Sequence, residues 1–156
     1  MTKFLTTHTG QKLAYSMTKG NGPSVIFLGG FKSDMEGSKA IFLEKWAKKR
    51  NRSFLRFDYS GHGQSSGDFL SLGIGDWLKD AMQIIELIKN NDLILVGSSM
   101  GGWVSLLLSR ELGKRLKGLV TIAAAPDFTE DSMLSLIHIS EPTRPRLISY
   151  AVFCLK

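Results

Sequence analysis

The sequence contains little that would mark a secreted, membrane-spanning or disulfide-stabilised protein. Cys154 is the single cysteine, so the chain can form neither a disulfide framework nor a cysteine metal cluster. No apolar run reaches the roughly 20 residues that a membrane-spanning helix needs. The first residues have neither the apolar segment of a signal peptide nor the arginines of a transit peptide. We therefore expect a cytoplasmic protein without a membrane span.

The chain also lacks a concentrated positive surface, although its formal net charge is +6. Its basic clusters at 48–52 and 114–117 fall at predicted helix ends, where cations complement the helix dipole. No basic stripe is interleaved with aromatic residues, as nucleic-acid-binding surfaces require, so we expect no nucleic-acid partner. A chain of 156 residues with 43% hydrophobic and 22% charged residues is typical of one folded domain.

The most informative stretch of the sequence is 93–108, LILVGSSMGGWVSLLL. Residues 93–96 predict a short buried strand, and residues 102–108 predict a buried helix. Between them, residues 97–101 fit the pattern G-x-S-x-G with Ser99 at its centre. This context predicts a strained turn that exposes the Ser99 hydroxyl as a nucleophile. The backbone N–H of Met100, in the first turn of the helix, would face an oxyanion formed there.

The rest of the chain predicts a sheet with helices on both faces. The predicted strands are 3–7, 12–18, 24–28, 53–57, 93–96 and 119–123, and the predicted helices are 39–50, 75–90 and 100–112. The first two strands are expected to form an antiparallel hairpin at one edge of the sheet. From residue 24 onward, apolar strands alternate with helices, which is typical of a mostly parallel α/β sheet. Ligands bind at the carboxyl ends of such strands, where 29–31, 58–60, Ser99 and Asp127 all fall.

Two local expectations concern the first predicted helix and the turn that precedes the first parallel strand. Ser38 is a plausible N-cap for the helix 39–50, because serine oxygens accept the free N–H groups of a first turn. The apolar residues of this helix, which predict its buried face, are Ile41, Phe42, Trp46 and Ala47. Residues 19–23, KGNGP, predict a turn.

Three segments resemble the α/β-hydrolase superfamily. They are GSSMGGW at 97–103, GGF at 29–31 in the position of the family's oxyanion loop, and FDYSGHGQS at 57–65, which is similar to the family's D-x-x-G-x-G-x-S loop. The resemblance covers residues 1–133. Within the superfamily, these segments are similar to the mitochondrial acyl-protein thioesterase and acyl-glucuronide esterase branch and to its bacterial relatives. The resemblance implies an α/β-hydrolase fold.

The same resemblance implies a serine-hydrolase mechanism. Ser99 would attack a small-molecule ester or acyl thioester and form an acyl-enzyme. The N–H groups of Met100 and Phe31 would bind the oxyanion. A histidine would accept the Ser99 proton, and an acid would orient that histidine. No cofactor and no metal ion are implied.

The chain departs from the family in the acid and the histidine, which normally follow later strands. The predicted sheet is truncated after its sixth strand, so we expect an N-terminal fragment that is inactive as it stands. Asp127 is a possible acid, although an aspartate at the start of a loop also commonly caps a turn. We expect His62 to shape its loop rather than to act as the base, and Asp58 to anchor that loop through hydrogen bonds.

Residues 134–156 do not resemble the family. This segment is similar to the translated read-through of a sequencing adapter, so we expect residues 1–133 to be the hydrolase part and the rest to be a non-family tail. The alternative is a genuine extension that forms a hairpin. Two other interpretations stay open: a complete short hydrolase that recruits His138 and Asp127, and a non-catalytic binding or scaffold protein with the same fold.

Overall fold

The computed structural model of the protein describes residues 1–88 and 92–124. The strands are β1 (Lys3–Thr6), β2 (Lys12–Thr18), β3 (Asn21–Leu28), β4 (Arg52–Phe57), β5 (Leu93–Ser98) and β6 (Leu116–Ile122). The helices are α1 (Ser38–Lys49), α2 (Ile74–Ile85) and α3 (Met100–Leu112), with short 3₁₀ helices η1 (Phe69–Ser71) and η2 (Gly113–Arg115). Each of the predicted strands and helices is present in this range.

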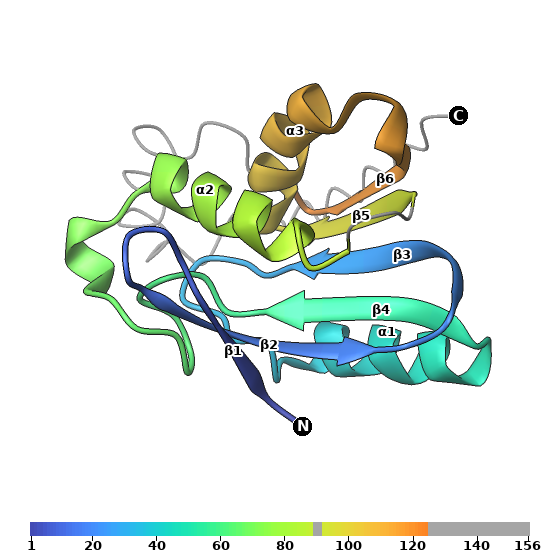
Figure 1. Cartoon of the computed structure of the whole chain (residues 1–156). Helices are drawn as coiled ribbons and strands as arrows, with labels where there is room; N and C mark the ends of the chain where they lie inside the picture. Colours follow the sequence, from blue (N-terminus) through green and yellow to red (C-terminus); the bar gives the residue numbers. More distant parts are fainter. Residues whose placement is uncertain (89–91, 125–156) are drawn as a thin grey trace, which may run out of the picture.

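The strands form one six-stranded sheet in the order β1-β2-β4-β3-β5-β6 (Figure 1). β2 pairs antiparallel with both β1 and β4, whereas β3 pairs parallel with β4 and β5, and β5 pairs parallel with β6. The prediction of an antiparallel edge on a mostly parallel sheet is therefore confirmed. The parallel strands are apolar and buried because helices cover both faces of the sheet.

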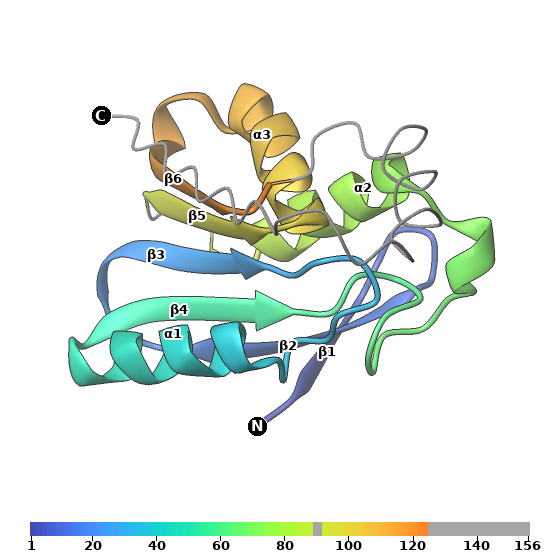
Figure 2. The ribbon, with the colours of Figure 1, turned by 180° about the vertical axis from the view of Figure 1, so that it is seen from behind.

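The three helices divide between the two faces of the sheet, as Figures 1 and 2 show from opposite sides. α1 packs on one face against a small apolar cluster, and α2 and α3 cover the other face over a larger one. The small cluster consists of Val25, Phe27, Ala40, Ala47, Phe54 and Val96. Alternate residues of β3 thus enter different clusters, as the two-residue period of a strand requires. In the described part of the chain, no helix has the length and apolar character needed to cross a membrane.

Several boundaries differ from the predicted ones. β3 begins at Asn21 rather than at residue 24, because a register shift between Asn21 and Val25 accommodates Pro23 within the strand. The turn prediction for 19–23 is therefore wrong over its second half. α2 ends at Ile85, whereas its apolar period predicted a helix to residue 90.

The buried face of α1 also differs from the prediction. Phe42 is 69% exposed, whereas Glu44 is buried. The reason is an ionic network: Arg56 of β4 donates to the Glu44 carboxylate from Nε at 3.2 Å and lies 3.1 Å from it through Nη2. Because its charge is paired, Glu44 can occupy the sheet-facing side of the helix. Ser38 is the first helical residue rather than the N-cap, which is Gly37.

Substitution of Glu44 by glutamine should lower the free energy of unfolding by about 3 kcal/mol at neutral pH, because Arg56 would lose a buried ionic partner. Burial by itself would raise the pKa of Glu44, but hydrogen bonds from Thr18 and Lys48 and the charge of Arg56 outweigh it and hold that pKa below its usual range. The carboxylate therefore stabilises the fold above the ordinary glutamate pKa, and this contribution is lost as the pH falls through the lowered value.

Urea unfolding at neutral pH and at about pH 3 measures both effects. Glu86→Gln is the matched control, because Glu86 is exposed. Equal free energies of unfolding for Glu44→Gln and Glu86→Gln at neutral pH would show that the ionic network is not stabilising.

Candidate active site

Ser99 lies in a strained turn between β5 and α3. Its backbone has φ 54° and ψ −118°, a region that residues other than glycine rarely occupy. The Ser99 N–H donates to the Ile122 carbonyl at 2.9 Å, and the Ser99 carbonyl accepts the Gly102 N–H at 2.9 Å. The residue is exposed at the carboxyl end of β5. The strained, exposed turn predicted from the sequence is confirmed.

Glycines allow the start of α3 to approach the sheet closely. A Cβ atom on Gly101 would collide with the carbonyl oxygen of Leu28, at the end of β3. A Cβ atom on Gly97 would likewise collide with the Gly101 carbonyl and with the hydroxyl of Ser105. Only glycine fits at both positions, and this contact fixes the direction in which the chain leaves Ser99.

The loop that follows β3 passes next to Ser99. A Cβ atom on Gly30 would lie 3.4 Å from the Ser99 Cβ. Phe31 follows directly, and its half-buried ring packs edge-on against Phe69 with 5.0 Å between the ring centroids. Met100 directly follows Ser99 and is the first residue of α3, where the helix N–H groups lack intrahelical acceptors. Met100 thus begins directly at the turn and Phe31 follows the glycine that lies beside it, and the role of both as oxyanion donors stays a prediction.

Asp58, directly after β4, joins two of the loops at this edge. Its carboxylate is buried and accepts the Met35 N–H at 2.6 Å and the Gln64 N–H at 2.9 Å. Met35 belongs to the loop between β3 and α1, and Gln64 to the loop between β4 and α2. Burial raises the pKa of Asp58, and these two hydrogen bonds oppose the rise. The predicted anchoring role of Asp58 is confirmed.

His62 is enclosed by aromatic side chains. It is 4% exposed, and its Nδ1 lies 3.1 Å from the Ser60 carbonyl oxygen. Its ring packs edge-on against Phe69 and Trp77 with centroid separations of 5.2 Å each. Trp77 Nε1 also donates to the Ser60 carbonyl at 3.1 Å. This packing agrees with a loop-shaping role for His62.

Asp80 is a buried carboxylate that the sequence analysis missed. It projects from α2 and accepts the Ser60 N–H at 2.8 Å, and its burial raises its pKa. The signal was present in the sequence, because Asp80 shares the helical spacing of the buried residues Trp77 and Ile84. Asp80 of α2 therefore binds the backbone of the loop between β4 and α2. Asp58, which belongs to that loop, binds it as well.

Two predicted residues, Asp127 and His138, lie outside the described residues. Within residues 1–88 and 92–124, no group of three or more His, Cys, Asp or Glu side chains could hold a metal ion. The described part of the site therefore consists of a hydroxyl, backbone N–H groups and the loops that hold them.

Comparison with known proteins identifies the family. The profile of the family described as serine aminopeptidase, S33, matches residues 23–149, which is more than half of the chain. The chain belongs to this α/β-hydrolase family. The match extends beyond residue 133, and the predicted boundary between a hydrolase part and a tail stays a prediction.

Two curated relatives are similar to part of the chain. The rat palmitoyl-protein thioesterase ABHD10, mitochondrial, is 41% identical over 115 residues, which are 74% of this chain and 39% of the rat protein. A putative esterase/lipase 2 from Mycoplasma pneumoniae is 32% identical over 99 residues, which are 63% of this chain and 36% of that protein. The chain thus spans less than half the length of these relatives.

Two solved structures share the fold. Mouse α/β hydrolase domain-containing protein 10 is 35% identical with a TM-score of 0.80, over 90% of this chain and 55% of that one. A putative hydrolase from Agrobacterium vitis S4 is 34% identical with a TM-score of 0.80, over 99% of this chain and 67% of that one. The predicted α/β-hydrolase fold class is confirmed.

The expectation of a cytoplasmic protein is wrong. It rested on the absence of a targeting segment from the first residues, whereas the rat, mouse and human relatives are named as mitochondrial proteins.

Substitution of Ser99 by glycine should raise the free energy of unfolding by about 1–2 kcal/mol, because glycine adopts the backbone angles of this turn without strain. Chemical denaturation of both proteins measures the difference. The matched control is Ser105→Gly in the interior of α3, where the hydroxyl donates to the Gly101 carbonyl at 2.6 Å. That control should be destabilised by about 1 kcal/mol or more. A destabilised Ser99→Gly protein would show that the turn is unstrained.

Proposed function

We propose that this chain carries the nucleophile and the oxyanion site of a serine hydrolase that cleaves a carboxylic ester or an acyl thioester. The observation that carries the proposal is the exposed Ser99 in its strained turn, at the first turn of α3 and beside the Gly30 loop. A strained backbone conformation of this kind costs of the order of 1–3 kcal/mol, and such conformations cluster at active sites, which supports a functional role for Ser99.

In the proposed reaction, Ser99 Oγ attacks the carbonyl carbon while a base accepts the hydroxyl proton. The N–H groups of Met100 and Phe31 donate to the carbonyl oxygen as it becomes negative, an effect worth roughly 3–4 kcal/mol per donor in a comparable site. The tetrahedral intermediate then expels an alcohol or a thiol and leaves the acyl group on Ser99. In a second step, water hydrolyses the acyl-enzyme and releases the carboxylic acid product.

In the family order, the acid and the base follow later strands, which this chain is proposed to lack, so we propose that it is inactive as it stands. His62 is a poor candidate, because its ring is enclosed by aromatic side chains and held at the Ser60 carbonyl. Asp127 is a possible acid within the chain, and a complete short hydrolase that recruits His138 together with Asp127 is the alternative. Without a working base, we expect turnover of only about 10³-fold above that in water, the level that oxyanion binding and substrate binding sustain alone.

The substrate class is proposed from the chemistry of the site and from the relatives. Attack on a thioester and attack on an ester use the same nucleophile and the same oxyanion donors. The rat relative is named a palmitoyl-protein thioesterase, which favours an acyl thioester. The Mycoplasma relative is named an esterase/lipase, which keeps the carboxylic ester in the proposal.

A fluorophosphonate should label the chain slowly and stoichiometrically at Ser99, because Ser99 Oγ forms a bond to phosphorus as fluoride leaves, and the phosphonyl oxygen of the tetrahedral product accepts from the same donors. Mass spectrometry of the labelled peptide identifies the site. Ser99→Ala should abolish the labelling, and Ser105→Ala should retain it, since Ser105 is buried.

Two outcomes would change the assignment. A folded chain that is never labelled at Ser99 would support the non-catalytic binding or scaffold alternative. If labelling and ester hydrolysis both fall in His138→Ala and in Asp127→Ala, the chain is a complete short hydrolase; full activity in His138→Ala excludes that interpretation.

A further inference from the structure

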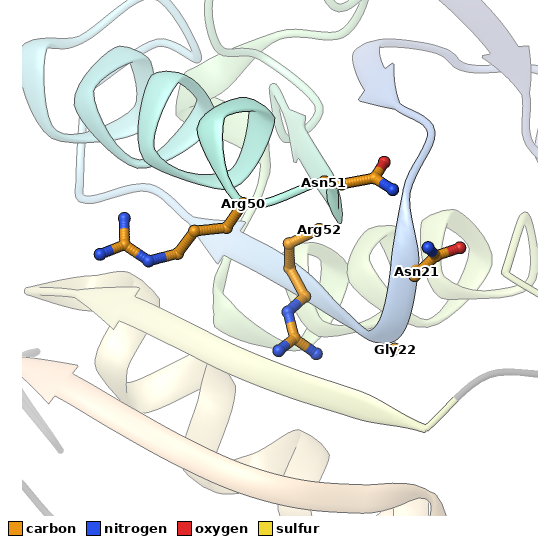
Figure 3. Close-up of a pocket in the computed structure, with 5 residues that line it drawn as sticks. All are labelled: Asn21, Gly22, Arg50, Asn51 and Arg52. Carbon is orange, nitrogen blue, oxygen red and sulfur yellow. The ribbon is translucent and has the colours of Figure 1, made fainter.

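A polar cavity lies at the opposite end of the sheet from Ser99. It has a volume of about 270 Å³ and is lined by Asn21, Gly22, Arg50, Asn51 and Arg52. Figure 3 shows that these residues come from two segments, the start of β3 and the turn from α1 into β4. β3 runs from this cavity to the edge that carries Ser99, a distance of roughly 23 Å at 3.3 Å per residue. The cavity is therefore separate from the hydrolase site.

The Arg52 guanidinium is seated across the backbone of Gly22. Gly22 has φ +69°, and a Cβ atom there would collide with Arg52 Nη1. Arg52 is paired with Asn21 in the register of β3 and β4, and the Asn21 N–H donates to the Asn51 carbonyl at 2.7 Å. The start of β3 and the start of β4 are thus joined by sheet pairing. Because Gly22 has no side chain, the Arg52 guanidinium can lie against its backbone.

The charge of Arg52 is not neutralised within the described part of the chain. Arg56, four residues further along β4, forms ion pairs with Glu36 and Glu44. Neither Arg52 nor Arg50 has a carboxylate of the described residues within ion-pair distance. The dipole of α1 accounts for cations in its last turn and at its end, including Arg50, but it does not account for Arg52, which belongs to β4.

We propose that this cavity binds the phosphate group of a small molecule, with Arg52 as its principal ligand. A guanidinium presents paired N–H donors that match two phosphate oxygens. Arg50, whose guanidinium lies 5.0 Å from the centroid of the Trp46 ring, supplies a second exposed cation. The cavity holds several water volumes, which is enough for a phosphate group and a small organic remainder.

Titration of the 156-residue chain with inorganic phosphate and with phenyl phosphate in 150 mM NaCl tests the proposal. The changes in the backbone amide NMR shifts of Asn21, Gly22 and Arg52 should reach a plateau as either ligand is added. Phenol should cause no change in these shifts. Arg52→Gln should weaken binding by roughly tenfold or more, the effect of losing a charged hydrogen bond. Tighter binding of phenyl phosphate would identify a phosphate ester as the ligand, and equal binding would identify free phosphate.

Two further variants separate a built site from general surface charge. Arg110→Gln removes the same charge from an exposed position on α3 and should leave binding unchanged. Gly22→Ala keeps the charge but displaces the Arg52 guanidinium, so binding should weaken; if this variant does not fold, as circular dichroism would show, Arg52→Gln decides. Shifts that do not saturate, or equal losses in Arg52→Gln and Arg110→Gln, would overturn the proposal.

Discussion

The first turn of α3 lies directly against the backbone at the ends of β3 and β5, and the candidate site depends on that contact. A side chain on Gly101 would meet the Leu28 carbonyl, and one on Gly97 would meet the Gly101 carbonyl. Because the helix can come so close, the chain must reverse within one residue, and Ser99 takes the strained conformation. The loop after β3 lies so near that a Cβ atom on Gly30 would be 3.4 Å from the Ser99 Cβ. This packing constraint thus sets the position of the Ser99 hydroxyl and of the predicted oxyanion donor at Met100.

Charged groups buried beside this contact hold the surrounding loops. Met35 is bound at both of its backbone groups: its N–H donates to Asp58 at 2.6 Å, and its carbonyl accepts from Arg56 Nη1 at 2.8 Å. A buried ion costs several kcal/mol unless hydrogen bonds satisfy it, so each of these groups constrains its neighbours strongly. The loop between β3 and α1, which carries Phe31, is therefore held in place by Arg56 of β4 and by Asp58, which follows β4.

The fold could be predicted from the sequence because its signals are local. Apolar runs for strands, helical spacing for α2 and the glycine pattern around Ser99 each depend on residues near in sequence. The errors concern residues whose place depends on distant partners. Glu44 is buried in place of Phe42 only because Arg56 is opposite, and Pro23 enters β3 only because the register of β3 and β4 shifts there.

The roles of Asp58 and His62 followed from the loop motif, whereas the pairing of Asp80 with Ser60 joins residues 20 apart. Such pairings are tertiary, and no single segment encodes them.

These contacts bear on what a later acid and histidine would contribute. The strain at Ser99 is maintained by Leu28, Gly97, Gly101 and Ile122, all within the described residues. The predicted oxyanion donors are backbone N–H groups, whose positions are set by the same strands and helix. An acid and a base added after β6 would therefore supply proton transfer to the predicted nucleophile, whose backbone is already fixed by these contacts. Because oxyanion binding and proton transfer act in the same transition state, their effects on rate are not additive. The residual rate expected without a base, about 10³-fold above that in water, is the part that the predicted oxyanion donors and substrate binding would sustain alone.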